Sequence, residues 1–202
     1  MDANPNVGRK VLEVGKLLGK NAGENPHQWY SPDSVTRVIE QVTADLKSID
    51  APDAAYFDQQ KASFTTTGLA QYRGLVQQIR AKYANTPVGA SESIFTPLAD
   101  ALGLKLLTPQ SFLGAIAEGT DPTAADKTTV DQQITGKQIK VFVFNSQNST
   151  PDVQRLVNDA QTVHIPVTTI TETLSPANAT FQDWQSKQLQ ALASALAQAG
   201  RA

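Results

Sequence analysis

Cysteine is absent from this chain, and histidine occurs only 2 times. The lack of cysteine excludes disulfide bonds and thiolate metal ligands, and it does not indicate a cellular compartment. No apolar run is long enough to span a bilayer, and the opening residues Met1 to Pro5 are too polar for a secretory signal peptide. Any metal site in this chain therefore has to rely mainly on oxygen ligands.

An excess of charge of one sign is lacking as well. The chain has 17 basic and 19 acidic residues, for a formal net charge of -2. This balance offers no electrostatic basis for binding nucleic acid or an anionic membrane, so neither is an expected partner. The 202 residues are 40% hydrophobic, which is typical of one or two soluble domains that bury a core.

One segment combines several rare residues. Asn25-Pro26-His27-Gln28-Trp29-Tyr30-Ser31-Pro32 holds one of the 2 histidines and one of the 2 tryptophans between two prolines. The prolines predict a rigid loop, and Ser31-Pro32 predicts the start of a helix, with serine as the N-cap. An imidazole on such a loop suits a metal ligand, or His27 satisfies only a local hydrogen bond.

Two helices are predicted in the first half of the chain. Apolar residues at helical spacing predict the first over about 32–48. A second pattern predicts a long helix over about 53–84, which would extend roughly 45–48 Å and could join two lobes or lie along one edge. Before the histidine loop, residues 7–20 have mixed spacing, which leaves strand and helix open.

From residue 86 onward, strands alternate with helices, as in a parallel α/β sheet. The strand at 139–144 is almost entirely apolar and is predicted to be central. The predicted strands are 86–90, 104–108, 139–144 and 165–170; the predicted helices are 94–102, 110–117, 123–135, one that starts at Thr150-Pro151, and a terminal one that contains Phe181 and Leu196.

Ligands of an open parallel sheet bind beyond the carboxyl ends of its strands. Glu92 follows the first strand, Asn145-Ser146-Gln147-Asn148 follows the third, and Glu172 follows the fourth. Two carboxylates thus share a rim, and with His27 they could bind a divalent transition ion such as Zn²⁺ or Mn²⁺. The alternative for each glutamate is a helix cap or a solvated loop charge. His164 precedes its strand, which indicates a surface or structural histidine.

The histidine loop resembles the Asp/Asn-Pro-His-x-Trp-x-x-Pro motif of the metal-binding proteins of zinc and manganese ABC importers. Ser91-Glu92-Ser93-Ile94-Phe95 is similar to the family's His-Asp-Ala-Phe segment, and Thr171-Glu172-Thr173-Leu174 is similar to its Thr-Asp-Ser-Leu segment. The helix over 53–84 resembles the linker helix between the two lobes of those proteins. The resemblance extends from about residue 10 to the end, and the histidine loop is its most specific part.

The resemblance implies a parallel-sheet carboxy-terminal α/β lobe over 86–202, a linker helix over 53–85, and the remnant of a second α/β lobe over 1–52. It matches His27 with a histidine ligand and Glu172 with the late acidic ligand. Glu92 stands where the family usually has a further histidine, so the ligand set is richer in oxygen. The implied function is that of a solute-binding protein without catalysis, which binds Zn²⁺ or Mn²⁺ as the transported solute outside the cytoplasm and delivers it to a membrane permease.

The chain departs from this family at its front, where most of the amino-terminal lobe and its histidine are missing. We interpret it as a truncated or divergent form, in which exposed apolar surface could produce a homo-dimer. Two alternatives stay open. One is a metal-free interaction or scaffold domain derived from this fold. The other is a hydrolase that uses Glu92 and Glu172 as a carboxylate pair.

Overall fold

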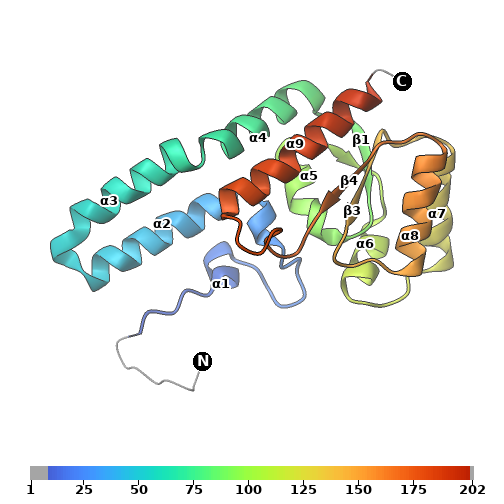
Figure 1. The fold of residues 1–202 in the computed structure, drawn as a ribbon. Helices are drawn as coiled ribbons and strands as arrows, with labels where there is room; N and C mark the ends of the chain where they lie inside the picture. The colour runs from blue at the N-terminus through green and yellow to red at the C-terminus, as the bar shows by residue number, and fades with distance from the viewer. Residues whose placement is uncertain (1–8, 201–202) are drawn as a thin grey trace. The chain divides into compact units, whose positions relative to one another are not determined.

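The fold is taken from a computed structural model that describes residues 9–200 (Figure 1). Contacts within the chain divide it into two compact units, with the boundary between Thr67 and Gly68. Each unit is described by itself. The three-part division expected from the sequence, with boundaries near residues 52 and 85, stays a prediction.

The described part of the first unit is built of helices. The sequence left residues 7–20 open between strand and helix, and their described part contains a short helix; Val7 lies outside the described residues. Ser31 and Pro32 begin the next helix as predicted, because the Ser31 hydroxyl accepts the Ser34 N–H. The elements are α1 (Val14–Leu18), η1 (Gln28–Tyr30), α2 (Pro32–Ile49), η2 (Ala51–Asp53) and α3 (Ala54–Ser63).

Helices α2 and α3 pack against each other and leave an open groove of about 290 Å³. Four of the apolar residues that predicted α2 line this groove together with Phe57 and Phe64, namely Val38, Ile39, Val42 and Leu46. Val42 and Leu46 belong to that stripe, yet they are 42% and 39% exposed. The periodicity therefore identified the helix correctly, whereas part of its apolar face stays open to solvent in this unit.

The long helix predicted over 53–84 is interrupted. After α3 the chain forms a π-helical turn, η3 (Phe64–Gly68), and then continues as α4 (Ala70–Tyr83). The hydroxyl groups of Thr65 and Thr66 donate to backbone carbonyls one turn earlier, at Lys61 and Ala62. Such back-bonding competes with the helical ladder, and π-helical turns inside helices commonly carry a local irregularity of this kind.

The second unit is an α/β fold with one parallel sheet, as predicted. Its strands are β1 (Pro87–Ala90), β2 (Lys105–Leu106), β3 (Val141–Asn145) and β4 (Val167–Ile170), in the order β2-β1-β3-β4. The predicted central strand is indeed internal, since β3 pairs with both β1 and β4. Strand β2 is shorter than the predicted 104–108.

Helices cover both faces of this sheet (Figure 1). Phe142 packs into an apolar cluster with α6, α7 and α8 on one face. Val141 and Val143 point to the opposite face by strand alternation, and α9 contacts both β3 and β4. None of the helices within residues 9–200 has the length and apolarity to cross a bilayer. The helices are η4 (Ser93–Phe95), α5 (Thr96–Leu102), α6 (Gln110–Ala117), α7 (Ala124–Thr135), α8 (Pro151–Thr162) and α9 (Phe181–Ala199).

The order of the strands determines where this sheet can form a ligand crevice. From β1 the chain moves outward to β2, then returns to the other side of β1 for β3 and β4. The direction of winding therefore reverses between β1 and β3. A crevice forms at such a reversal, at the carboxyl ends of the strands. The residues that follow Ala90 and those that close β3 at Asn145 border this position.

Candidate metal centre

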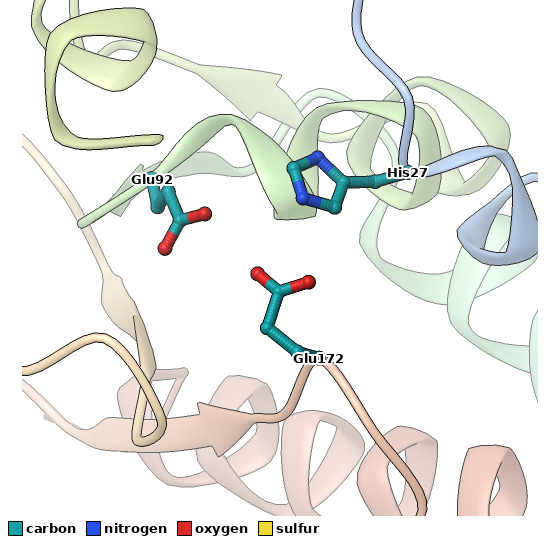
Figure 2. A group of neighbouring side chains, drawn as sticks. All are labelled: His27, Glu92 and Glu172. Carbon is teal, nitrogen blue, oxygen red and sulfur yellow. The ribbon is translucent and has the colours of Figure 1, made fainter. Parts of the chain in front are cut away.

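The structure brings Glu92 and Glu172 together at the carboxyl rim of the sheet. Glu92 lies two residues after β1, and Glu172 lies two residues after β4. Each offers a carboxylate oxygen within 4.8 Å of the other, and the two carboxyl groups face one another (Figure 2). Two negative charges at this separation repel each other unless a proton or a cation lies between them.

Asn145 bridges the two carboxylates. Its Nδ2 donates to Glu92 Oε2 at 2.8 Å and to Glu172 Oε1 at 3.0 Å, and the residue is fully buried. The orientation of the amide is fixed independently, because Asn145 Oδ1 accepts the backbone N–H of Gln147 at 3.0 Å. The last residue of the central strand thus holds two acidic loops at a common point.

Glu92 is held by a second amide and does not act as a helix cap. Asn148 Nδ2 donates to Glu92 Oε2 at 3.0 Å and to the carbonyl oxygen of Ile116 at 3.1 Å. Glu92 occupies the N-cap position of η4, yet its side chain makes no capping hydrogen bond. Its exposure is only 2%. The alternatives of a capping or solvated Glu92 are therefore excluded by its surroundings.

The loop that carries Glu172 is fixed on both sides of this residue. The Trp184 indole N–H donates to Thr171 Oγ1 at 2.8 Å, and the Thr171 N–H donates to Gln188 Oε1 at 2.9 Å, which ties the loop to α9. The Thr173 N–H donates to Gln147 Oε1 at 2.9 Å. Glu172 is half-buried, and its backbone is held by α9 and by the loop after β3.

Burial is the main reason that the pKa of Glu172 is raised above its ordinary value. The negative charge of Glu92 and a hydrogen bond with Glu92 raise it further, whereas the hydrogen bond from Asn145 lowers it. Glu172 therefore retains its proton to a higher pH than a solvated glutamate does. A bound cation would take the place of that proton.

His27 belongs to the first unit, where it lies directly before η1 and is buried. Its ring Nδ1 is 2.8 Å from Asn25 Oδ1, which also accepts the His27 backbone N–H at 3.0 Å. A backbone donor can only meet the oxygen of this amide, so Nδ1 is the donor in this contact, and in the neutral imidazole Nε2 carries the lone pair. That tautomer is the one that ligates a metal through Nε2.

The rest of the histidine loop is tied to α2. Gln28 Nε2 donates to the carbonyl oxygen of Asn25 at 2.8 Å, and the Ser34 hydroxyl donates to Gln28 Oε1 at 3.1 Å. The Trp29 ring meets the imidazole edge to face, with centroids 5.3 Å apart. These contacts hold the loop against α2, and it includes the 3₁₀ turn η1, which the sequence did not indicate.

The other acidic and histidine residues considered from the sequence do not join this centre. His164 is exposed, and its Nδ1 contacts the carbonyl oxygen of Thr162 at 3.0 Å, which agrees with a surface histidine. A hollow of about 380 Å³ lies beside Asp121 and Asp152. Lys127 contacts both of these aspartates, at 4.0 Å and 2.6 Å, so one cation of the chain already offsets part of their charge.

Two contributors received no role from the sequence, namely Asn145 and Asn148. Both were visible as amides directly after the central apolar strand, at the rim that was singled out for Glu92 and Glu172. Their spacing could not reveal that both reach the same carboxylate oxygen, because the turn after β3 sets that geometry. The amide pair at the end of a buried strand is the feature that would have identified them.

Comparison with known proteins gives one family and a set of similar structures. Residues 1–195 match the family described as zinc-uptake complex component A, periplasmic (ZnuA). Comparison with curated protein sequences yields no match.

Three of the similar solved structures illustrate the range of TM-score, sequence identity and coverage. A Mn-bound mutant of a periplasmic metal-binding protein from Candidatus Liberibacter asiaticus has a TM-score of 0.73 and 19% identity, over 96% of this chain and 74% of that one. The Cd-bound form has a TM-score of 0.68 and 18% identity, with the same coverage of 96% and 74%. A mutant of the laminin-binding adhesin from Streptococcus agalactiae has a TM-score of 0.65 and 16% identity, over 92% and 70%.

Proposed function

The chain belongs to the family of periplasmic zinc-uptake component A proteins, and on this premise we propose that it is the solute-binding component of an ABC importer for a divalent transition metal. The family consists of metal-binding proteins of transport systems. The observation that carries the proposal is the pair of carboxylates, Glu92 and Glu172, held at the switch point of the sheet by one shared amide.

We propose that the ion is the transported solute and that His27, Glu92 and Glu172 are its protein ligands. The two glutamates supply oxygen from the second unit, and His27 supplies Nε2 from the first. The Asn25 contact supports the role of His27, because metal-ligating histidines usually donate their other ring N–H to an oxygen acceptor. Three protein ligands leave a coordination position for water.

The donor set favours a transition ion over a purely oxygen-bound cation. One imidazole nitrogen with two carboxylates suits Zn²⁺ or Mn²⁺, and imidazole is a poor ligand for Mg²⁺ and Ca²⁺. Similar proteins have been solved with Mn and with Cd bound. We propose Zn²⁺ or Mn²⁺ as the native ion, with oxygen-rich coordination moving the preference toward Mn²⁺.

The proposed location and partner follow from this role. A solute-binding protein acts outside the cytoplasm, in the periplasm or attached to the cell surface, and delivers its ion to the membrane permease of the importer. Catalysis is not part of this function. The homo-dimer expected from the sequence stays a prediction, which sedimentation velocity over a range of chain concentrations would test.

The two alternatives receive less support. A metal-free scaffold domain would tolerate an exposed Glu92, whereas this side chain is buried and accepts two amide hydrogen bonds. A carboxylate-pair hydrolase needs its substrate between the two carboxyl groups. Here Glu92 and Glu172 are linked to each other by a hydrogen bond and by the Asn145 amide.

Isothermal titration with Zn²⁺ and Mn²⁺ tests the proposal. We expect one ion per chain, and we expect His27→Ala or Glu172→Ala to weaken binding by at least about 100-fold, the upper end of the loss caused by removing an outer partner of a ligand. Glu118→Ala is the matched control, since Glu118 is an exposed glutamate of the second unit. Binding that is absent, or that survives both substitutions unchanged, would refute the site.

A further inference from the structure

One oxygen of Glu92 is fully engaged by the protein. Glu92 Oε2 accepts two hydrogen bonds, from Asn145 Nδ2 at 2.8 Å and from Asn148 Nδ2 at 3.0 Å. An ionised carboxylate has about four acceptor positions, two on each oxygen. Both positions on Oε2 therefore belong to amide donors, so an ion would have to bind Glu92 through its other oxygen, Oε1.

Neither amide can give up this contact at little cost. The second Nδ2 hydrogen of Asn145 goes to Glu172 Oε1, and its Oδ1 accepts the Gln147 N–H. The second Nδ2 hydrogen of Asn148 goes to the carbonyl oxygen of Ile116. Each asparagine is thus fixed by partners other than Glu92. Turning it away from Glu92 would also break those bonds, in surroundings where unsatisfied donors are costly.

We infer that Asn145 and Asn148 are positioning residues that restrict Glu92 to binding an ion through a single oxygen, and that they thereby set the ion preference of the site against Ca²⁺. The inference rests on the proposed function. Ca²⁺ takes about six to eight oxygen ligands and often uses both oxygens of one carboxylate. Zn²⁺ is satisfied by about four ligands with single-oxygen carboxylates, so the restriction disfavours Ca²⁺ more.

The same two amides also act on the charge of the site. They place N–H dipoles against Glu92 without adding a third carboxylate, so the rim presents two carboxyl groups rather than a larger cluster. A larger set of oxygen ligands is the arrangement that Ca²⁺ sites use. Selectivity then comes from the number of oxygens that are available, and the asparagines control that number.

The test compares the unmodified chain with Asn148→Ala and Asn145→Ala, by titration with whichever of Zn²⁺ and Mn²⁺ the unmodified chain binds more tightly, and separately with Ca²⁺. For Asn148→Ala we expect the affinity for that transition ion to fall about 10–100-fold, while Ca²⁺ affinity falls less or rises. The ratio of the two affinities should then drop by at least about tenfold. Asn158→Ala, which removes an exposed asparagine on α8, should leave both affinities unchanged.

Infrared spectra of the ion-loaded proteins add a readout that a purely structural role would not move. The separation between the symmetric and antisymmetric carboxylate bands should shift from single-oxygen toward two-oxygen coordination in Asn148→Ala. Asn148 lies in a half-exposed turn, so Asn148→Ala tests the inference even if Asn145→Ala does not fold.

The outcomes separate the two proposals. An unmodified chain that binds neither Zn²⁺ nor Mn²⁺ refutes the proposed function before any variant is measured, and this inference falls with it. An unmodified chain that binds one of these ions, with the affinities for that ion and for Ca²⁺ changed by the same factor in Asn148→Ala and with unchanged carboxylate bands, refutes this inference alone. The asparagines would then only support the fold.

Discussion

Asn25 determines which nitrogen of His27 holds the lone pair. Its Oδ1 accepts both the backbone N–H and the Nδ1–H of His27, so one short side chain fixes the loop and the tautomer together. The sequence could predict a stiff loop from its two prolines. It could not predict this contact, since the alternative of a histidine with only a local hydrogen bond fits the same residues.

We expect Asn25→Ala to reduce Mn²⁺ affinity about 10–100-fold, because the imidazole loses the partner that orients it. Asn21→Ala is the control, since Asn21 lies in the preceding turn, is exposed and contacts only Glu24 among the hydrogen bonds described for its side chain. The measurement is isothermal titration at constant pH. Equal affinities for the two variants would show that the Asn25 contact has no role in binding.

The raised pKa of Glu172 makes the stability of the metal-free chain depend on pH. A carboxyl group whose pKa is higher in the folded than in the unfolded state binds its proton more tightly when folded. Its stabilising contribution is complete below the ordinary value of 4.5 and is lost as the pH rises through the raised pKa. Chemical unfolding in the presence of a chelator should therefore show stability falling over this window.

Glu172→Gln should flatten that dependence, because the amide does not titrate. Glu118→Gln should leave it as in the unmodified chain. Metal affinity should rise over the same pH window, since the ion has to displace the proton. Parallel stability curves for the unmodified chain and Glu172→Gln would contradict the cause assigned to the shift.

At the scale of elements, β1 depends on having no side chain at Gly89. A Cβ there would lie 2.7 Å from Ile139 Cδ1 and 3.1 Å from Phe142 Cδ2. Both neighbours are buried in the core, so neither can move aside freely. The same strand pairs in parallel with β3, which brings Glu92 to the end of β3.

Gly89→Ala should accordingly destabilise the fold by about 1–3 kcal/mol through overpacking. Gly114→Ala, in α6, meets nothing within 4 Å and should instead stabilise by about 0.5–1 kcal/mol through the helical preference of alanine. Urea unfolding of the two variants measures their free energies of unfolding, which should change in opposite directions. Stabilisation by both substitutions would mean that the core beside Gly89 yields readily.

Sequence patterns predicted these elements where local chemistry fixes them. Ser31-Pro32 begins α2, Gly103 ends α5 in the left-handed conformation, and the apolar run in β3 lies inside the sheet. The patterns failed to predict where an element ends when the local chemistry does not fix its boundary. The threonines in η3 interrupt a helix whose apolar spacing is continuous, and β2 is shortened to two residues at the edge of the sheet.

For the whole molecule, the order of the strands explains how residues far apart in sequence form one centre. Glu92 and Glu172 come from two different loops and Asn145 from the end of β3, and the parallel sheet brings all three to one rim. The general rule for open α/β sheets was sufficient to select Glu92 and Glu172 from sequence. The asparagines that connect them, and the raised pKa of Glu172, required the structure.

The central claim is that one transition ion is held by His27, Glu92 and Glu172. Anomalous diffraction at the zinc K edge, from crystals of the unmodified chain grown with one equivalent of Zn²⁺, tests it most directly. We expect one strong peak per chain, about 2.0–2.2 Å from His27 Nε2 and from one oxygen of each glutamate. A peak located elsewhere, for example between Asp121 and Asp152, or no peak at all, would contradict it.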